Sequence, residues 1–208
     1  LIKGFVETLQ QGALQNKEEA QRFLKIMARQ VDRLNAIIED LLSLSRLEQN
    51  SESSEMILED TELKTLLESV IRDCELKTPD RSSVIHLSCD ENLQASVNPP
   101  LLSQAVINLV DNALKYSDPG KSVEIKVSQN TSEILIEVLD YGCGIGSEHL
   151  PRLFERFYRV DEARSRKLGG TGLGLAIVKH IAQAHHGRVS AHSTLGKGSR
   201  FCIHLPIK

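Results

Sequence analysis

The side chains best suited to chemistry share one face of a predicted helix over residues 101–116. The face carries four such residues at steps of four, three and one along the helix, namely Asn108, Asn112, Lys115 and Tyr116. Asparagine competes for backbone hydrogen bonds within a helix and is unfavourable in an apolar core, so two on one face need a polar partner. An amide oxygen is a suitable ligand for Mg²⁺. The face therefore indicates a polar site with a candidate metal ligand.

Glycine is concentrated late in the chain, where ten of the thirteen glycines follow residue 140. Most of them form three clusters, DYGCGIG at 140–146, GGTGLG at 169–174 and GKG at 196–198. Glycine lets a backbone approach a ligand closely. The second cluster opens a predicted helix over 171–186, whose free N–H groups and positive dipole end suit a polyphosphate.

Basic residues crowd the segment 152–167, just before the second glycine cluster. A long loop of this kind beside glycines is typical of a mobile flap that closes over phosphates. The alternative is a solvated basic face. Phe154 and Phe157 are expected to anchor such a flap to the domain.

Two other nucleotide motifs do not fit this chain. The first glycine cluster has the spacing GxGxG and follows an Asp, whereas a dinucleotide-binding turn needs GxGxxG at the start of a helix. No GxxxxGK(S/T) sequence occurs, which excludes a P-loop.

Residues 1–49 predict a helical hairpin, with one helix ending near Gly12 and a second running from Asn16 to about Leu47. Apolar residues of the second helix alternate steps of four and three, forming a heptad seam of Ala20, Leu24, Met27, Val31, Leu34, Ile38 and Leu41. Further apolar positions widen this stripe, so we expect two hairpins to meet as a four-helix bundle in a homodimer. The alternative is that the hairpin packs on the C-terminal domain of its own chain.

Residues 50–57 are predicted to be a linker, because the chain there is polar and lacks hydrophobic periodicity. Residues 58–208 then predict helices on one face of a mixed sheet, with strands near 84–89, 122–129, 134–139, 188–193 and 200–205. The predicted fold class is α+β, a helical hairpin followed by a two-layer α/β sandwich.

Charge, cysteine spacing and hydropathy exclude several classes of partner and location. A net charge of −3 gives no field suited to nucleic acid. The four cysteines form no CxxC pair and are expected to be buried or idle thiols in a reducing compartment. No apolar run approaches the ~18 residues that span a bilayer, and no signal peptide is present, so we expect a cytoplasmic chain without membrane contact. Because the sequence opens inside a helical pattern, we also expect a fragment.

The ordered segments NLVDNALKY, DYGCGIG, LFERFYR, GGTGLGLAIVK and GKGS resemble the N, G1, F, G2 and G3 boxes of bacterial sensor histidine kinases, in particular the phosphate-regulon sensor type. The hairpin extends the likeness over nearly the whole chain. The resemblance implies a GHKL-type ATP-binding catalytic domain, ATP and Mg²⁺ as ligands, and ATP-dependent protein-histidine kinase activity. It also implies a homodimer, a response regulator as partner in two-component signal transduction, and a membrane-anchored full-length sensor.

The resemblance also assigns roles to individual residues. Asn112 should hold Mg²⁺ against the phosphates, and Asp140 should accept a hydrogen bond from the adenine amine. Asn108 and Arg159 are the catalytic candidates, with Arg159 reaching the γ-phosphate as charge develops. The ATP site implied in full is Asn108, Asn112, Lys115, Tyr116, Asp140, Gly142, Gly144, Ile145, Arg159, Gly170, Thr171, Gly172, Leu173 and Gly174. Tyr141 stands where the family usually has a smaller polar residue.

The phosphate acceptor of the family is a His on the first hairpin helix, yet all seven histidines of this chain lie in the C-terminal module. We therefore expect the acceptor upstream of Leu1, and a chain that binds ATP without phosphorylating itself. Three alternatives stay open: a GHKL ATPase with a Glu near the metal Asn, where this chain has Asn108 and Asp111; a serine kinase, which would lack the long hairpin; and a non-catalytic dimerisation module.

Overall fold

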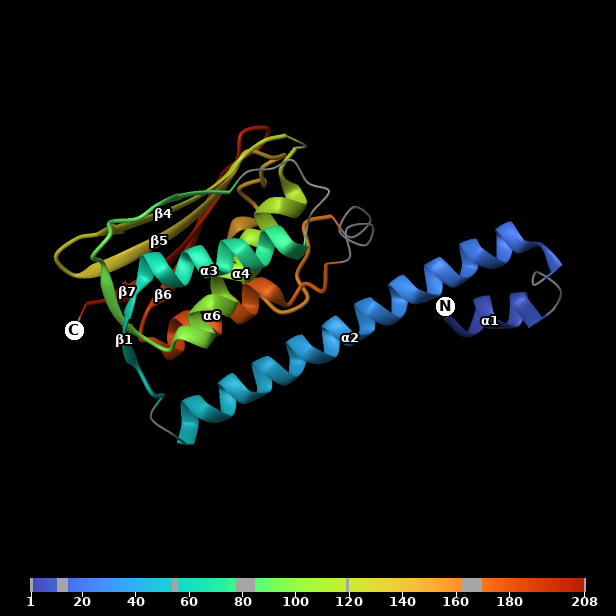
Figure 1. Cartoon of the computed structure of the whole chain (residues 1–208), viewed down its shortest axis with the longest axis horizontal. Coiled ribbons are helices and arrows are strands. Elements are labelled where there is room, and N and C mark those ends of the chain that lie inside the picture. Colours follow the sequence, from blue (N-terminus) through green and yellow to red (C-terminus); the bar gives the residue numbers. More distant parts are fainter. Residues whose placement is uncertain are drawn as a thin grey trace.

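The computed structural model describes residues 2–10, 15–53, 56–77, 85–118, 120–161 and 170–207. Its N-terminal module is a helical hairpin that projects from an α/β domain (Figure 1). Helix α1 (Ile2–Gln10) folds back along the start of the long helix α2 (Lys17–Ser53). Asn16 caps α2, because its Oδ1 accepts the backbone N–H groups of Glu18 and Glu19 at 3.2 and 3.3 Å. The predicted hairpin is confirmed.

Helix α2 continues beyond its predicted end at Leu47 and reaches Ser53. Residues 50–53, the first part of the predicted linker, are therefore helical. Neither Gly nor Pro interrupts this stretch, and the preceding turns are held because Leu44 and Leu47 are buried in the core of the C-terminal domain. Polar composition indicated a linker, but the helix continues to Ser53.

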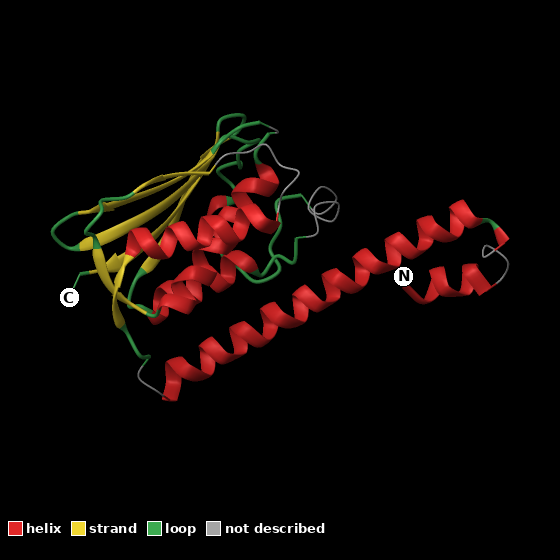
Figure 2. Cartoon of the chain, viewed as in Figure 1, coloured by secondary structure: helices red, strands yellow, loops and turns green. Residues whose placement is uncertain are grey.

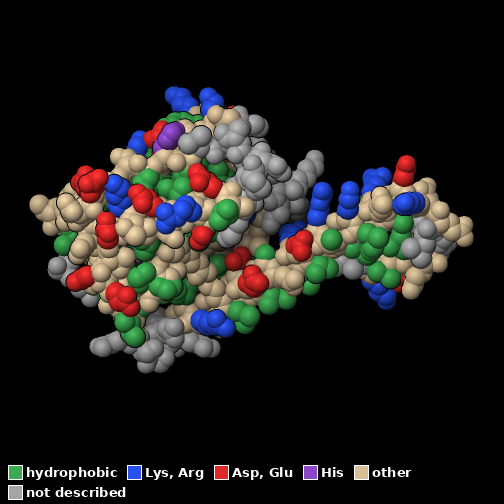
Figure 3. Space-filling view, viewed as in Figure 1, with side chains coloured by type: hydrophobic (Ala, Val, Ile, Leu, Met, Phe, Trp, Pro, Cys, Tyr) green, Lys and Arg blue, Asp and Glu red, His purple; other side chains and the backbone are tan. Residues whose placement is uncertain are grey.

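Most of the heptad seam of α2 is left uncovered by its own chain, although Ala20 is buried. Leu24 and Leu34 are 54% and 52% exposed, and Figure 3 shows apolar side chains along the projecting helix. Packing of the hairpin on its own domain, the alternative to dimerisation, is realised along the C-terminal half of α2, where Leu44 and Leu47 are buried and Ile37 packs against the core. The seam keeps the exposed apolar face that the predicted dimer requires.

In its described residues, the C-terminal domain has two layers, a five-stranded sheet and three helices on one of its faces (Figure 2). The strand order is β2-β4-β5-β7-β6, with β2 parallel to β4 and the other neighbours antiparallel. The strands are β2 (Ile85–Ser88), β4 (Val123–Gln129), β5 (Glu133–Asp140), β6 (Arg188–Thr194) and β7 (Gly198–Pro206). Burial alternates strictly along β5, as expected for a sheet covered on one face. The predicted mixed sheet and two-layer fold class are confirmed.

A separate two-stranded ribbon pairs β1 (Glu59–Glu62) with β3 (Gln94–Val97). Strand β3, the four residues QASV, was not predicted from the sequence. Its pairing with β1 joins segments far apart in the chain, so no local pattern reveals it.

The three helices of this layer are α3 (Leu63–Lys77), α4 (Pro99–Tyr116) and α6 (Gly174–Ala184). Helix α4 begins with Pro99 and Pro100 in its first turn, and Asn98 caps it by accepting the Leu101 backbone N–H at 3.2 Å. It packs against both α3 and α6. None of the described helices combines the length and apolar content that a bilayer span requires.

Buried His185 joins the end of α6 to the start of α4. Its Nδ1–H donates to the Ile181 carbonyl at 2.8 Å, and its Nε2 accepts the Asn98 backbone N–H at 2.9 Å. These partners require the neutral ring, since a second ring proton would face the Asn98 N–H. Burial accordingly lowers the pKa of His185 below its ordinary value.

We expect the free energy of unfolding to fall as pH drops below about 6.5, where the unfolded chain protonates this histidine and the folded chain does not. The folded pKa is the lower one, so stability is full above the unfolded pKa and decreases below it, by at most about 1.4 kcal/mol per pH unit. Urea denaturation of the wild type and His185→Gln between about pH 7.5 and about pH 5.5 measures the slope. The variant should show the flatter dependence, and equal slopes would contradict the assignment.

Candidate nucleotide-binding site

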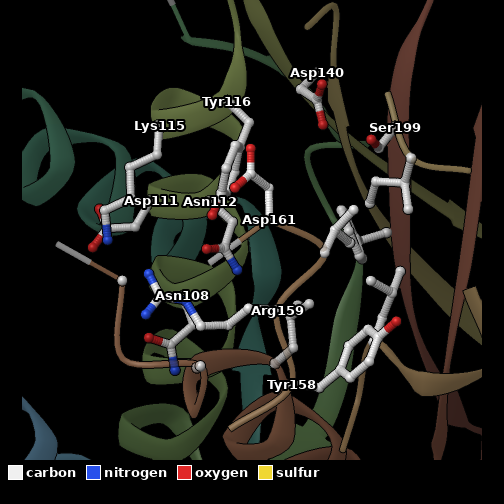
Figure 4. Close-up of a pocket in the computed structure, with 18 of the residues that line it drawn as sticks. Asn108, Asp111, Asn112, Lys115, Tyr116, Asp140, Tyr158, Arg159, Asp161 and Ser199 are labelled. Carbon is white, nitrogen blue, oxygen red and sulfur yellow. The ribbon is translucent and has the colours of Figure 1, made fainter. Parts of the chain in front are cut away.

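A cavity of about 450 Å³ lies between α4, the first glycine cluster and the second glycine cluster. Figure 4 shows Asn108, Asn112, Lys115 and Tyr116 reaching into it from α4, with Asp140 and Ser199 at its far end. Every residue of the predicted ATP site lines this cavity except Gly142 and Leu173. Residues more than sixty positions apart in the sequence are thus brought together as predicted.

The polar face of α4 is exposed to the cavity because the opposite face is fully used in the core. The buried side chains of α4 are Leu102, Ala105, Val106, Leu109, Val110, Ala113 and Leu114. The amide nitrogen of Asn108 is buried and has no hydrogen-bond acceptor among the described residues. An unsatisfied donor of this kind costs about 1–3 kcal/mol, and an anionic oxygen entering the cavity would satisfy it.

The side-chain oxygens on this face of α4 are also suitable ligands for Mg²⁺ bound together with phosphates. Among the described residues, no three or more His, Cys, Asp or Glu side chains gather into a metal cluster. Mg²⁺ commonly takes few protein ligands and completes its shell with water and phosphate oxygens. The amide of Asn112 beside the cavity suits that role.

Asp140 ends strand β5 and is only 6% exposed. Its Oδ1 accepts the Gly142 backbone N–H at 3.0 Å, and Ser199 donates to it as well. Burial raises the pKa of Asp140, and these hydrogen bonds oppose the shift. A desolvated carboxylate at the cavity wall favours a ligand that donates hydrogen bonds.

Gly142 and Leu173 shape the site without lining it. A Cβ on Gly142 would lie 2.0 Å from the Tyr116 carbonyl oxygen, so only glycine lets the first cluster lie against the end of α4. Leu173 is fully buried and immediately precedes α6. Its side chain anchors the second cluster in the core and does not line the cavity, so its role in ATP binding stays a prediction.

The predicted flap is held to the domain by Phe154, whose ring meets Phe201 edge-on at 6.5 Å. The same prediction for Phe157 is wrong, because its side chain is 56% exposed. Its backbone makes the contact instead: the Phe157 N–H donates to the Gly172 carbonyl at 2.9 Å, with Phe157 itself at φ +63°. The flap residues Arg164, Arg166 and Lys167 lie outside the described residues.

Tyr158 and Arg159 follow Phe157 and both line the cavity. Tyr158 is fixed from two sides, by His149 Nδ1 at 2.7 Å from its hydroxyl and by the Arg152 guanidinium 4.4 Å from its ring centre. The segment that carries Arg159 is thereby held beside the cavity.

Several lining residues were not predicted. Tyr158, Val160 and Asp161 flank Arg159, and Ser199 follows the third glycine cluster, so their positions beside predicted boxes were an available signal. Cys143 also lines the cavity, although the four cysteines were expected to be buried or idle thiols. Ala36 and Asp40 come from α2, and nothing in their sequence context pointed to the site. Tyr141 does not line it; its hydroxyl donates to Glu124 at 2.6 Å.

We expect Gly172→Ala to weaken binding of a fluorescent ATP analogue by about tenfold or more. Gly172 has φ +79°, and an added Cβ would lie 3.0 Å from Phe157 Cα, so the side chain would strain the backbone and push the flap away. Gly196→Ala is the matched control, because Gly196 has φ +74° with no atom near the added Cβ. Equal losses in the two variants would show that backbone strain alone, and not the contact with the flap, is responsible.

Comparison with known proteins agrees with this geometry. Residues 97–208 match the family described as histidine kinase-, DNA gyrase B-, and HSP90-like ATPase, and residues 1–50 match the His Kinase A (phospho-acceptor) domain. The sensor protein kinase WalK of Staphylococcus epidermidis is 37% identical over 207 residues, covering 99% of this chain and 33% of that protein. WalK of Staphylococcus aureus is 35% identical over 207 residues, with 99% of this chain and 34% of the relative covered. The chain thus spans about a third of the length of these relatives.

Among solved structures, the Acinetobacter baumannii histidine kinase AdeS is similar over 100% of this chain and 93% of its own, with 25% identity and a TM-score of 0.76. The mycobacterial sensor histidine kinase MprB is 26% identical over 72% of this chain and 97% of its own, with a TM-score of 0.61. The narrower phosphate-regulon assignment stays a prediction, since the relatives named here are WalK proteins. The chain belongs to the histidine kinase-, DNA gyrase B- and HSP90-like ATPase family, and it joins that ATPase domain to a phosphoacceptor-type hairpin in the layout of a sensor histidine kinase core.

Proposed function

We propose that this chain is the ATP-binding and dimerising core of a cytoplasmic kinase region, which transfers the γ-phosphoryl group of ATP to a histidine and from there to a response regulator aspartate. One observation carries the proposal: a hydrogen-bond-accepting carboxylate and a set of amide and cationic groups face each other across one cavity. That polarity matches a nucleotide, with its donating adenine amine at one end and its phosphates at the other.

Asp140 is the proposed adenine-recognition residue. Because its carboxylate accepts hydrogen bonds, it favours the exocyclic amine of adenine over the carbonyl oxygen that guanine carries at the same position. Gly142 and Ser199 hold the carboxylate in place through their hydrogen bonds to it. Adenine specificity then follows from one oriented side chain.

At the other end, the proposed phosphate groups are Asn108, Lys115, Arg159 and the second glycine cluster at the N-terminus of α6. Mg²⁺, held by Asn112, would neutralise charge on the bridging phosphate oxygens. Asn108 donates its unsatisfied amide to a phosphate oxygen, and Arg159 stabilises the charge that develops during transfer. The absence of a Glu four residues before Asn112 argues against the hydrolase alternative.

The acceptor histidine is proposed to lie outside these 208 residues. Residues 1–50 match the phosphoacceptor domain, yet all seven histidines follow residue 85. None of the described histidines lines the cavity. Dimerisation through the α2 seam and a membrane-anchored full-length sensor are proposed on the family likeness and on the exposed seam residues.

We expect the chain to bind ATP without labelling itself, and to phosphorylate a separately supplied family hairpin that contains the histidine. Arg159→Ala should lower the rate of transfer by about 100-fold or more while changing ATP affinity less, because it acts on charge formed in the transition state. Radiolabelled ATP and gel separation of the two polypeptides measure both products. Stable phosphohistidine on the chain alone would refute the assignment of the acceptor, and an unlabelled hairpin alongside normal ATP binding would refute kinase activity.

We expect Asp140→Asn to weaken ATP binding by about 10-fold to 100-fold. If the amide oxygen keeps the hydrogen bonds from Gly142 and Ser199, the amide nitrogen meets the adenine amine, donor against donor. The folded protein should not be destabilised, because the variant removes a buried charge whose pKa burial raises. Calorimetric titration and a thermal melt check the two expectations, and unchanged affinity would mean that adenine binds elsewhere.

A further inference from the structure

Helix α2 supplies a carboxylate to the nucleotide cavity. Asp40 lines the cavity although it belongs to the N-terminal hairpin, and its Oδ2 accepts a hydrogen bond from Thr171 Oγ1 at 2.7 Å. Thr171 lies in the second glycine cluster, where the helix dipole and free N–H groups favour phosphate. Its hydroxyl also accepts the Leu173 N–H at 3.2 Å, so its single proton is committed to Asp40. A phosphate oxygen can accept a hydrogen bond from the Thr171 hydroxyl only if the hydroxyl stops donating to Asp40.

Asp40 and a bound phosphate would also compete for the same positive charge. Burial raises the pKa of Asp40, while the Thr171 hydrogen bond and the charge of Lys115 oppose the shift. Lys115 is also a proposed phosphate ligand. Asp40 and a triphosphate therefore draw on the same hydroxyl and the same ammonium group, and their negative charges repel each other at short range.

Asp40 is one part of a larger contact between α2 and the α/β domain. Ser43 accepts a hydrogen bond from Gln104 of α4 at 3.0 Å, and Glu48 forms an ion pair with Arg156 in the flap segment. Leu44 is buried between these two polar contacts along the helix. Within this interface, the Asp40–Thr171 hydrogen bond lies in the cavity, so it links helix docking to nucleotide.

We propose that Asp40 acts as a latch that competes with the nucleotide phosphates for Thr171. The Asp40–Thr171 hydrogen bond holds α2 on the α/β domain, and phosphates that take the Thr171 hydroxyl release the helix. The inference rests on the proposed nucleotide function of the cavity and adds its regulation. Because coupling between two binding events is reciprocal, a latch that nucleotide opens must also oppose nucleotide binding. The opposition should grow with the number of phosphates and be absent for adenosine.

The first experiment measures the affinities of adenosine, ADP and ATP, each with Mg²⁺, by calorimetric titration of the 208-residue chain. Asp40→Asn should bind ATP about threefold to tenfold more tightly than the wild type, ADP less so, and adenosine equally. Glu39→Gln is the matched control, since it removes one negative charge at the next residue, which is exposed and does not line the cavity. Its affinities should equal those of the wild type.

Each other outcome has a distinct meaning. A wild type that binds no nucleotide would refute the proposed function itself. If the wild type binds ATP but Asp40→Asn binds it equally or more weakly, the latch is wrong. Weaker binding of ATP by Asp40→Asn, with adenosine binding unchanged, would instead indicate that Asp40 contributes to the metal site. An equal gain in affinity for adenosine, or an equal gain in ATP affinity in Glu39→Gln, would also overturn the latch, because neither gain would depend on the Thr171 hydroxyl.

The second experiment follows the helix itself by hydrogen exchange of the α2 amides over residues 36–47. A non-hydrolysable ATP analogue should speed exchange in the wild type, and Asp40→Asn should exchange at the faster rate before any nucleotide is added. Exchange that slows or stays constant when the analogue saturates the wild type would overturn the release of α2. A thermal melt of Asp40→Asn confirms that the domain is folded in both measurements.

Discussion

The burial of one face of α4 is the constraint on which the site depends. Seven side chains of this helix enter the core between the sheet, α3 and α6, and they fix its rotation about its own axis. Asn108, Asn112, Lys115 and Tyr116 must then face the cavity. Close packing makes this orientation rigid, because a rotated α4 would bury amides and expose leucines.

The far wall of the cavity depends on backbone contacts that only glycine permits. Gly142 lets the first cluster lie against the end of α4, and a Cβ on Gly198 would lie 2.0 Å from the Asp140 carbonyl oxygen. Strands β5 and β7 meet there, so Asp140 and Ser199 face each other across the ladder. The buried carboxylate is held by neighbours on two separate segments, which explains why a desolvated charge is stable at that position.

Helix α2 serves two surfaces at once. Its exposed seam of Leu24, Leu34 and their heptad neighbours suits a second hairpin, while Leu44 and Leu47 dock on the α/β domain of the same chain. Asp40 lies on the docking side and enters the cavity. The same helix therefore carries both the exposed seam and a residue that lines the cavity, and the proposed latch would couple ATP to the hairpin through it.

Hydrophobic periodicity in the sequence determined the hairpin and the mixed sheet. Most of the site could also be predicted, because paired asparagines and clustered glycines are unfavourable unless a ligand or a tight backbone contact requires them. The resemblance ordered these residues into one site, and all but Gly142 and Leu173 line the cavity. Strand β3 depends on non-local pairing with β1, which no local pattern records. The same holds for Asp40: on a helix surface it is an ordinary acidic residue, and only the docking of α2 on the domain brings its carboxylate to Thr171.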